Sequence, residues 1–193
     1  MSAPTLGRFL VELLVAAEAL AAVERFRARG EAYGAALARA RAEGRKLVVV
    51  GDPHAGLHTR IVPAYGCGDV CVDLTGCPGC GGAGVAVDLT RERVPGVADG
   101  SAVVFVSCVL EYVSDPQAAW RECLRMAGDA SRVYLVTVQA WTVTASLYPG
   151  ARWTIARRAD GGIDATPVGG AGVLRAGAVA AGVGMLASGR RLP

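Results

Sequence analysis

A strand–helix–strand unit at residues 99–138 is the feature that most constrains the fold of this chain. Residues 103–106 and 133–138 are valine-rich runs, as expected for strands that are buried on both faces. Between them, Asp115 and Pro116 supply a helix N-cap and a favoured first helical position. Because two strands joined through a helix run parallel, the sequence predicts an α/β fold with a mostly parallel sheet.

Further segments extend this pattern on both sides of the unit. Apolar runs of strand length predict three more parallel strands, and an Asp-Gly-Gly turn between two short runs predicts a C-terminal antiparallel hairpin. The runs are residues 47–50, 70–73 and 84–89 for the parallel strands and residues 152–155 and 163–166 for the hairpin. We therefore expect an α/β domain at residues 46–168, between an N-terminal helical segment at residues 1–45 and a Gly/Ala-rich tail at residues 169–193.

Acidic side chains follow two of the predicted strands. Asp73 ends the second run and Asp88 lies near the end of the third, while residues 107–109 form the turn after the fourth. The carboxyl ends of parallel strands lie at one edge of a sheet, where open α/β proteins bind ligands. We therefore expect these three positions to share a ligand site, although a turn-forming role also explains an aspartate after a strand.

In order and residue type, these motifs resemble the late half of a class I S-adenosylmethionine-dependent methyltransferase domain of the type 11 group. That group has an acidic-Gly-Ser turn, a strand, Val-Leu-Glu-His-hydrophobic, Asp-Pro, a helix and another strand. The matching residues are Asp99-Gly100-Ser101, Val109-Leu110-Glu111-Tyr112-Val113 and Asp115-Pro116, with Tyr112 where His is commonest. The resemblance covers about residues 46–168 and implies a Rossmann-like, doubly wound sheet that closes with the antiparallel hairpin. Residues 65–80 are also similar to methyltransferase-like proteins encoded by large DNA viruses.

The resemblance implies that S-adenosylmethionine binds at the carboxyl edge of the sheet. It assigns Asp73 to the ribose hydroxyls and Asp88 to the adenine amino group. The whole cofactor-binding set that it implies is Gly51, Asp52, Gly56, Asp73, Asp88 and Ser107. The loop after the first strand departs from the family's glycine-rich pattern, because Pro53 and His54 stand where glycine would help and residues 48–50 offer no carboxylate.

Two classes of function remain open at this point. The first is a methyltransferase of unknown methyl acceptor, in which Glu111 or Tyr112 faces the substrate. The second is a catalytically inactive protein that keeps the fold as a structural or interaction module. The acids Asp73 and Asp88 favour the first class, and the altered glycine loop favours the second.

The charge of the chain limits the classes of partner that it is expected to bind. The net charge is only +3, and the basic residues are spread along the chain without the block that nucleic-acid-binding arms carry. We therefore expect no nucleic-acid partner. The expected location is the cytoplasm, or the host cytoplasm or virion if the protein is viral.

The hydrophobic stretch at residues 9–23 is the nearest approach to a membrane element. It has 15 residues and contains Glu12 and Glu18, whereas a spanning helix needs about 20 apolar residues. We expect a helix that packs on the sheet, on a protein partner or at a membrane interface. The face expected to be buried consists of Leu10, Leu13, Leu14 and Leu20. A second helix is expected at residues 31–43, after Gly30.

Four of the six cysteines lie close together in the sequence, at positions 67, 71, 77 and 80. A zinc site, a redox pair and plain burial each explain such a group. The two histidines follow the first predicted strand, and the last two cysteines of this group follow the second. Neighbouring loops would then bring together four side chains that can bind zinc tetrahedrally. These ligands are His54, His58, Cys77 and Cys80. Cys71, inside a strand, is most simply a small core residue, and a Cys77–Cys80 disulfide would require oxidising conditions.

Overall fold

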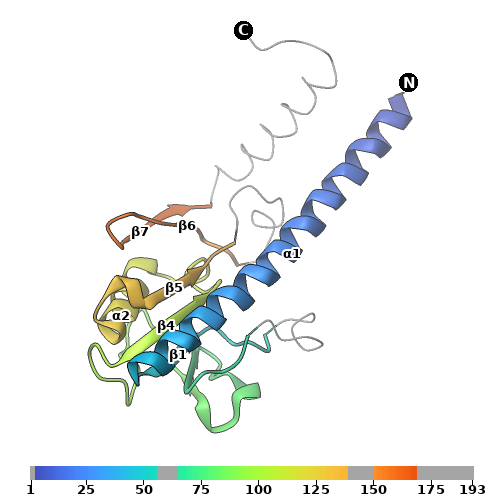
Figure 1. The fold of residues 1–193 in the computed structure, drawn as a ribbon. Helices are drawn as coiled ribbons and strands as arrows, with labels where there is room; N and C mark the ends of the chain where they lie inside the picture. The colour runs from blue at the N-terminus through green and yellow to red at the C-terminus, as the bar shows by residue number, and fades with distance from the viewer. Residues whose placement is uncertain (1–2, 56–64, 139–149, 169–193) are drawn as a thin grey trace.

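The structure is a computed structural model and describes residues 3–55, 65–138 and 150–168. These residues form a central sheet, a separate hairpin, two α-helices and two short 3-10 helices (Figure 1). In chain order the elements are α1 (Ala3–Glu43), β1 (Lys46–Val50), β2 (Val70–Asp73), η1 (Pro78–Ala83), β3 (Gly84–Ala86), β4 (Ala102–Ser107), α2 (Pro116–Ala127), η2 (Ala130–Arg132), β5 (Val133–Val136), β6 (Trp153–Arg157) and β7 (Ile163–Pro167). The predicted Gly/Ala-rich tail lies outside the described residues.

The central sheet is parallel, with its five strands in the order β3-β2-β1-β4-β5. Strand β1 lies in the middle, where Val48 is opposite Val70 of β2 and Val104 of β4. The predicted α/β class with a parallel sheet is therefore confirmed. The predicted hairpin also forms, but within the described part of the chain β6 and β7 pair with each other in a separate antiparallel sheet. The family resemblance implied that the hairpin continues the parallel sheet, whereas in the structure the hairpin is separate from it.

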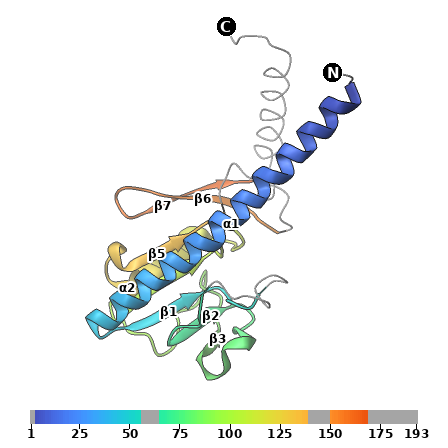
Figure 2. The ribbon, with the colours of Figure 1, turned by 45° about the vertical axis from the view of Figure 1, so that its right-hand side comes forward.

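Helices cover both faces of the sheet, because side chains of the central strands alternate between two cores. On one face, Leu47, Val49 and Phe105 pack with Ala36 and Ala40 of α1, which crosses the sheet in Figure 2. The core on the other face contains Val48, Val50, Val104, Val106, Trp120, Cys123 and Met126. Every residue of β4 is buried, as is all of β1 except Lys46, so both strands need continuous apolar sequences.

The N-terminal region forms one helix of 41 residues, not the two that the sequence predicted. Gly30 lies inside it without ending it, since a single interior glycine costs only about 1 kcal/mol and its neighbours favour helix. Gly44 ends the helix with a positive φ of 62°, a conformation that suits glycine. The expected break at Gly30 was therefore wrong, because the helix-favouring residues on both sides outweigh the low helix propensity of this glycine.

The N-terminal half of α1 extends beyond the sheet (Figure 1). Leu13 and Leu20, expected to be buried, are 51% and 66% exposed, and Phe9 is 55% exposed. The structure therefore does not dock this part of α1 on the domain. The side chains of Leu10 and Leu14 lie outside the described set. Among the described helices, none combines the length and the apolar character needed to cross a membrane.

Helix α2 begins as its sequence predicts, and it contacts the hairpin. The Asp115 carboxylate caps it by accepting a hydrogen bond from the Ala118 N–H at 2.9 Å. Trp120 Nε1 donates to the Gly161 carbonyl at 3.2 Å, within the hairpin turn. Ile155 and Ile163 of the hairpin belong to the same core as α2. The hairpin therefore contacts the domain through α2 and through side chains, such as Arg157, whose Nη1 donates to the Val133 carbonyl of β5 at 2.6 Å.

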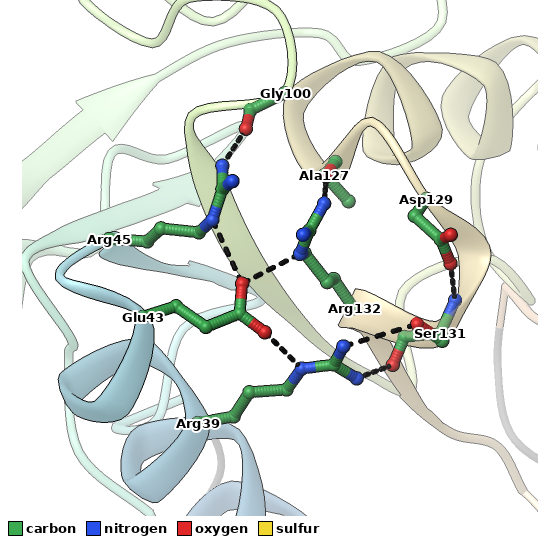
Figure 3. A network of polar contacts seen from close by, with 8 residues as sticks. All are labelled: Arg39, Glu43, Arg45, Gly100, Ala127, Asp129, Ser131 and Arg132. Carbon is green, nitrogen blue, oxygen red and sulfur yellow. Dashed lines mark hydrogen bonds and ion pairs between the residues drawn. The ribbon is translucent and has the colours of Figure 1, made fainter.

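A network of arginines around Glu43 closes the amino edge of the sheet (Figure 3). The Glu43 carboxylate pairs with Nε of Arg39 and of Arg132 at 2.7 Å and with Nε of Arg45 at 2.9 Å. The hydrogen bond from Arg39 is the main reason that the pKa of Glu43 lies below its usual value. The same guanidinium groups donate to backbone carbonyls at Ser131, Gly100 and Ala127. Glu43 thus joins the end of α1 to the segments that precede β4 and β5.

Replacing the central carboxylate should weaken this connection. We expect Glu43→Gln to lower the midpoint of thermal unfolding, because three arginines lose their shared anion. Glu31→Gln is the matched control on the same helix, since Glu31 forms only an exposed pair with Arg27 at 3.6 Å. Equal midpoints for the two variants, measured by circular dichroism at neutral pH, would contradict a structural role for the network.

Candidate functional site

A cavity of about 430 Å³ lies at the carboxyl edge of the sheet. It is bounded by the ends of β1, β2 and β4 and by the side of α1 that faces this edge. Its polar lining includes Asp52, Asp73, Ser107, Tyr112, Arg25 and Arg29. Cavities of this size hold small organic ligands, and in α/β folds the carboxyl edge is where such ligands bind.

A second cavity of about 200 Å³ adjoins the first, and both are lined by Asp73, Cys108, Val109 and Tyr112. Its remaining walls are mainly apolar, with Asp88 as a further acid. The apolar lining comprises Val72, Leu74, Val87, Leu89, Val109 and Val113. Asp73 thus lines both cavities, between the charged side chains of the larger one and the mainly apolar walls of the smaller one.

The predicted cofactor residues divide between these two cavities. Gly51, Asp52, Asp73 and Ser107 line the larger one, and Asp73 and Asp88 line the smaller one. Gly56 lies outside the described residues. The structure therefore brings together the described members of the set at one edge, as the strand order of the sequence led us to expect.

Gly51 is required by the shape of the larger cavity. Its φ is +105°, and a Cβ built there would lie 2.7 Å from Cγ2 of Val109 and 3.0 Å from the Ser107 carbonyl oxygen. A side chain at this position would therefore force the ends of β1 and β4 apart. Next to Gly51 in space, Cys108 has a φ of +50°, which is uncommon for a residue other than glycine. Such conformations gather at binding sites, where surrounding contacts hold them.

Both strand-end aspartates form turns while facing the cavities. One oxygen of Asp73 accepts from the Thr75 N–H at 3.0 Å and from its hydroxyl at 2.8 Å. Asp88 accepts from the Thr90 hydroxyl at 2.6 Å and from the Thr90 N–H at 3.0 Å, and these bonds hold the pKa of Asp88 below its usual value. In each case these hydrogen bonds use Oδ1, while Oδ2 of Asp88 also pairs with Nε of Arg91 at 3.7 Å on the exposed side.

The two residues suggested to face a substrate lie in different surroundings. Tyr112 lines both cavities, whereas Glu111 is only 2% exposed. The Glu111 carboxylate accepts from the Val138 N–H at 2.7 Å, and its backbone carbonyl accepts from Arg152 and Trp153. Burial raises the pKa of Glu111. Glu111 therefore connects β5 to the start of the hairpin, and Tyr112 is the better placed of the two to meet a ligand.

Arg25 and Arg29 of α1 line the larger cavity, which the sequence analysis did not foresee. Nη2 of Arg29 lies 3.0 Å from Sγ of Cys108, and both arginines lower the pKa of that thiol while burial raises it more. Their spacing of four residues puts them on one side of a helix, which was the available signal. The spacing alone does not show which part of the molecule the two arginines face, because that depends on where α1 packs on the sheet.

The sequence left a zinc site, a redox pair and plain burial open for the cysteine group, and the structure forms two disulfides. Cys67 is bonded to Cys80 and Cys71 to Cys77, so the Cys77–Cys80 disulfide is not formed. Of the expected zinc ligands, His54 lies beside Cys67, with Nε2 at 3.9 Å from Sγ. His58 lies outside the described residues. Cys71 is buried as expected of a core residue, and it is also bonded, which the sequence did not reveal.

No family model, curated protein or solved structure matches this chain. Function is accordingly inferred from the geometry and chemistry of the described residues, together with the motif resemblance. The features that matter most are the paired acids, the two adjoining cavities and the two arginines on α1.

The buried Glu111 makes a pH-dependent contribution to stability that can be measured. Because burial raises its pKa in the folded chain, this contribution is complete below the ordinary value of 4.5 and is lost as pH rises through the raised pKa. Glu111→Gln keeps an oxygen for the Val138 N–H and removes the charge. We therefore expect its stability relative to the natural chain to improve between about pH 4 and about pH 8 in urea unfolding. Parallel pH profiles, or the same improvement in the exposed control Glu92→Gln, would contradict this.

Proposed function

We propose that this chain binds S-adenosylmethionine at the carboxyl edge of its sheet and is a divergent methyltransferase-like protein with a Rossmann-like, doubly wound fold. The observation that carries the proposal is the position of Asp73, which lines both cavities at the carboxyl edge of the sheet. The strand order with β1 central and helices on both faces also supports this fold. The methyl acceptor is not assigned.

The smaller cavity suits the adenosine half of the ligand. Val72, Val87 and Leu89 provide apolar walls for a flat base. Asp88 would accept a hydrogen bond from the adenine amino group, and the Oδ2 atom of Asp73 would accept one from a ribose hydroxyl. An ionised carboxylate accepts hydrogen bonds at both oxygens, and the lowered pKa of Asp88 favours the ionised form.

The larger cavity suits the amino-acid half. Arg25 and Arg29 place two guanidinium groups where a ligand carboxylate would be bound, and such charge-assisted bonds are among the strongest in proteins. Asp52, in the loop after β1, supplies an acid for the ligand's ammonium group. The loop lacks the family's glycine-rich sequence, so α1 would take over part of the binding that the loop usually provides.

Methyl transfer requires mainly that the two reactants be held in line. With S-adenosylmethionine bound, a lone pair of the acceptor would form a bond to the methyl carbon as the carbon–sulfur bond breaks. The electrons of that bond would stay on sulfur as a neutral thioether, and an acceptor that carries a proton would release it to solvent. Holding two reactants in this way can supply much of the rate enhancement without a protein nucleophile. Tyr112, which lines both cavities, is the residue placed to contact an acceptor beside the sulfur.

Cofactor binding is tested by calorimetric titration of the full chain with S-adenosylhomocysteine. We expect Asp73→Ala to weaken binding by about 1–3 kcal/mol, or roughly 5- to 150-fold in Kd, because ribose hydroxyls lose a charged acceptor. Asp164→Ala, an exposed acid on the hairpin, should bind like the natural chain. Failure of the natural chain to bind at millimolar ligand would refute the proposal.

A second candidate function is that of a membrane-surface anchor, which does not require catalysis. It is favoured by the exposed apolar side chains of Phe9, Leu13 and Leu20, which share one face of α1 because helical residues follow at about 100°. A helix that lies at a lipid interface buries such a face among the headgroups.

Flotation with liposomes tests this anchor. We expect the full chain to float with vesicles and the double variant Leu13→Gln, Leu20→Gln to stay at the bottom, since it removes two apolar contacts with lipid. Ala19→Gln, at an exposed position on another side of α1, is the control and should still float. If the natural chain stays at the bottom with both neutral and anionic lipid, the anchor is excluded.

A further inference from the structure

Four cysteines gather on the side of the sheet that α1 covers. Cys71 lies in β2, Cys67 precedes it, and Cys77 and Cys80 lie at the start of η1. Along the chain they form two short pairs, with three residues between Cys67 and Cys71 and two between Cys77 and Cys80. Both spacings lie in the range that is typical of ligand pairs in structural zinc sites.

The fold brings these two sequence pairs into one cluster. Each disulfide joins a cysteine of the first pair to one of the second, Cys67 to Cys80 and Cys71 to Cys77. The Sγ atoms of Cys71, Cys77 and Cys80 also lie within 4.8 Å of one another. Zinc–thiolate bonds of about 2.3 Å put the sulfurs of a tetrahedral site roughly 3.8 Å apart, so the sulfurs of Cys71, Cys77 and Cys80 have nearly the required spacing. Cys67 groups with Cys80 and His54, whose ligand atoms also lie within 4.8 Å of one another, so zinc binding would draw Cys67 toward Cys71 and Cys77.

We propose that, in the reduced chain, Cys67, Cys71, Cys77 and Cys80 bind one zinc ion as a structural four-thiolate site. Thiolates are soft ligands that select zinc, and four of them complete its tetrahedral coordination. Cys71 and Cys77 are both 0% exposed, and this burial favours metal binding over free thiolates. A buried thiolate is costly without a partner, and the metal supplies one.

His54 supports this cluster from the loop after β1. Its Nε2 lies 3.9 Å from Sγ of Cys67, and its ring packs on Gly79. A Cβ at position 79 would lie 2.4 Å from Cδ2 of His54, so only glycine allows the Cys77–Cys80 turn to approach the ring. We assign His54 as a partner that donates a hydrogen bond to the Cys67 thiolate, because ligand sulfurs are tuned by such outer contacts.

Formation of the site is a balanced reaction with a phosphine as reductant. Each disulfide accepts two electrons and two protons and becomes two thiols, while the phosphine takes an oxygen from water and becomes a phosphine oxide. The four thiols then lose their protons to the buffer as the metal binds. No other reactant is needed.

Cobalt titration of the full chain tests the proposal, because Co²⁺ occupies tetrahedral thiolate sites and reports them by its absorption. The chain is reduced with the phosphine under anaerobic conditions, freed of metal with a chelator and titrated with Co²⁺. We expect one equivalent to bind with thiolate-to-cobalt charge-transfer bands, and Zn²⁺ to displace it. A reduced, folded chain that gives no such bands, or a chain that keeps both disulfides under these conditions, would overturn the proposal.

Variants then test the ligand set. Cys67→Ser and Cys77→Ser should each lose the stoichiometric four-thiolate spectrum, while Cys108→Ser, whose thiol is free, should keep it. His54→Ala should keep one equivalent and the same bands at weaker affinity. An unchanged spectrum in both cysteine variants would overturn the assignment. So would a spectrum of the natural chain that shows a nitrogen ligand which is absent in His54→Ala. Circular dichroism of each variant shows whether it is folded, and Cys80→Ser replaces any that is not.

Discussion

The burial of β1 and β4 on both faces is the constraint on which the rest of the structure depends. Leu47–Val50 and the whole of β4 are buried, so the sheet needs cover on two sides. Helix α1 provides one cover, and α2 with the hairpin provides the other. The hydrophobic effect therefore decides the architecture, and it leaves only the edges of the sheet for polar chemistry.

The two edges are used differently. At the amino edge, Glu43 and three arginines bind the end of α1 to the segments before β4 and β5, which closes that end with polar contacts (Figure 3). At the carboxyl edge, the positive φ of Gly51 and of Cys108 turns the backbone away and leaves cavities. The cysteine cluster borders this edge, since Cys71 and Cys77 enclose Asp73 in the sequence. A metal there would hold the loop that positions the proposed ribose acceptor.

Sequence patterns predicted those parts of the fold that have local causes. The strands follow from runs of apolar residues, and the start of α2 follows from Asp115 and Pro116. The sequence analysis predicted two helices in place of α1, because glycine often ends a helix. The cost of Gly30 is outweighed only when all the residues of α1 are considered together. The acids of the site were found because they end strands. Arg25, Arg29 and the crossed pairing of the cysteines depend on how distant segments pack, so no local pattern reveals them.

A crystal structure of the full chain with S-adenosylhomocysteine tests the central claim most directly. The account predicts adenine between Val72 and Val87, a ribose hydroxyl on Asp73 and the ligand carboxylate near Arg25 and Arg29 of α1. Ligand density at another place on the molecule, or none at the carboxyl edge from crystals grown at saturating ligand, would contradict it.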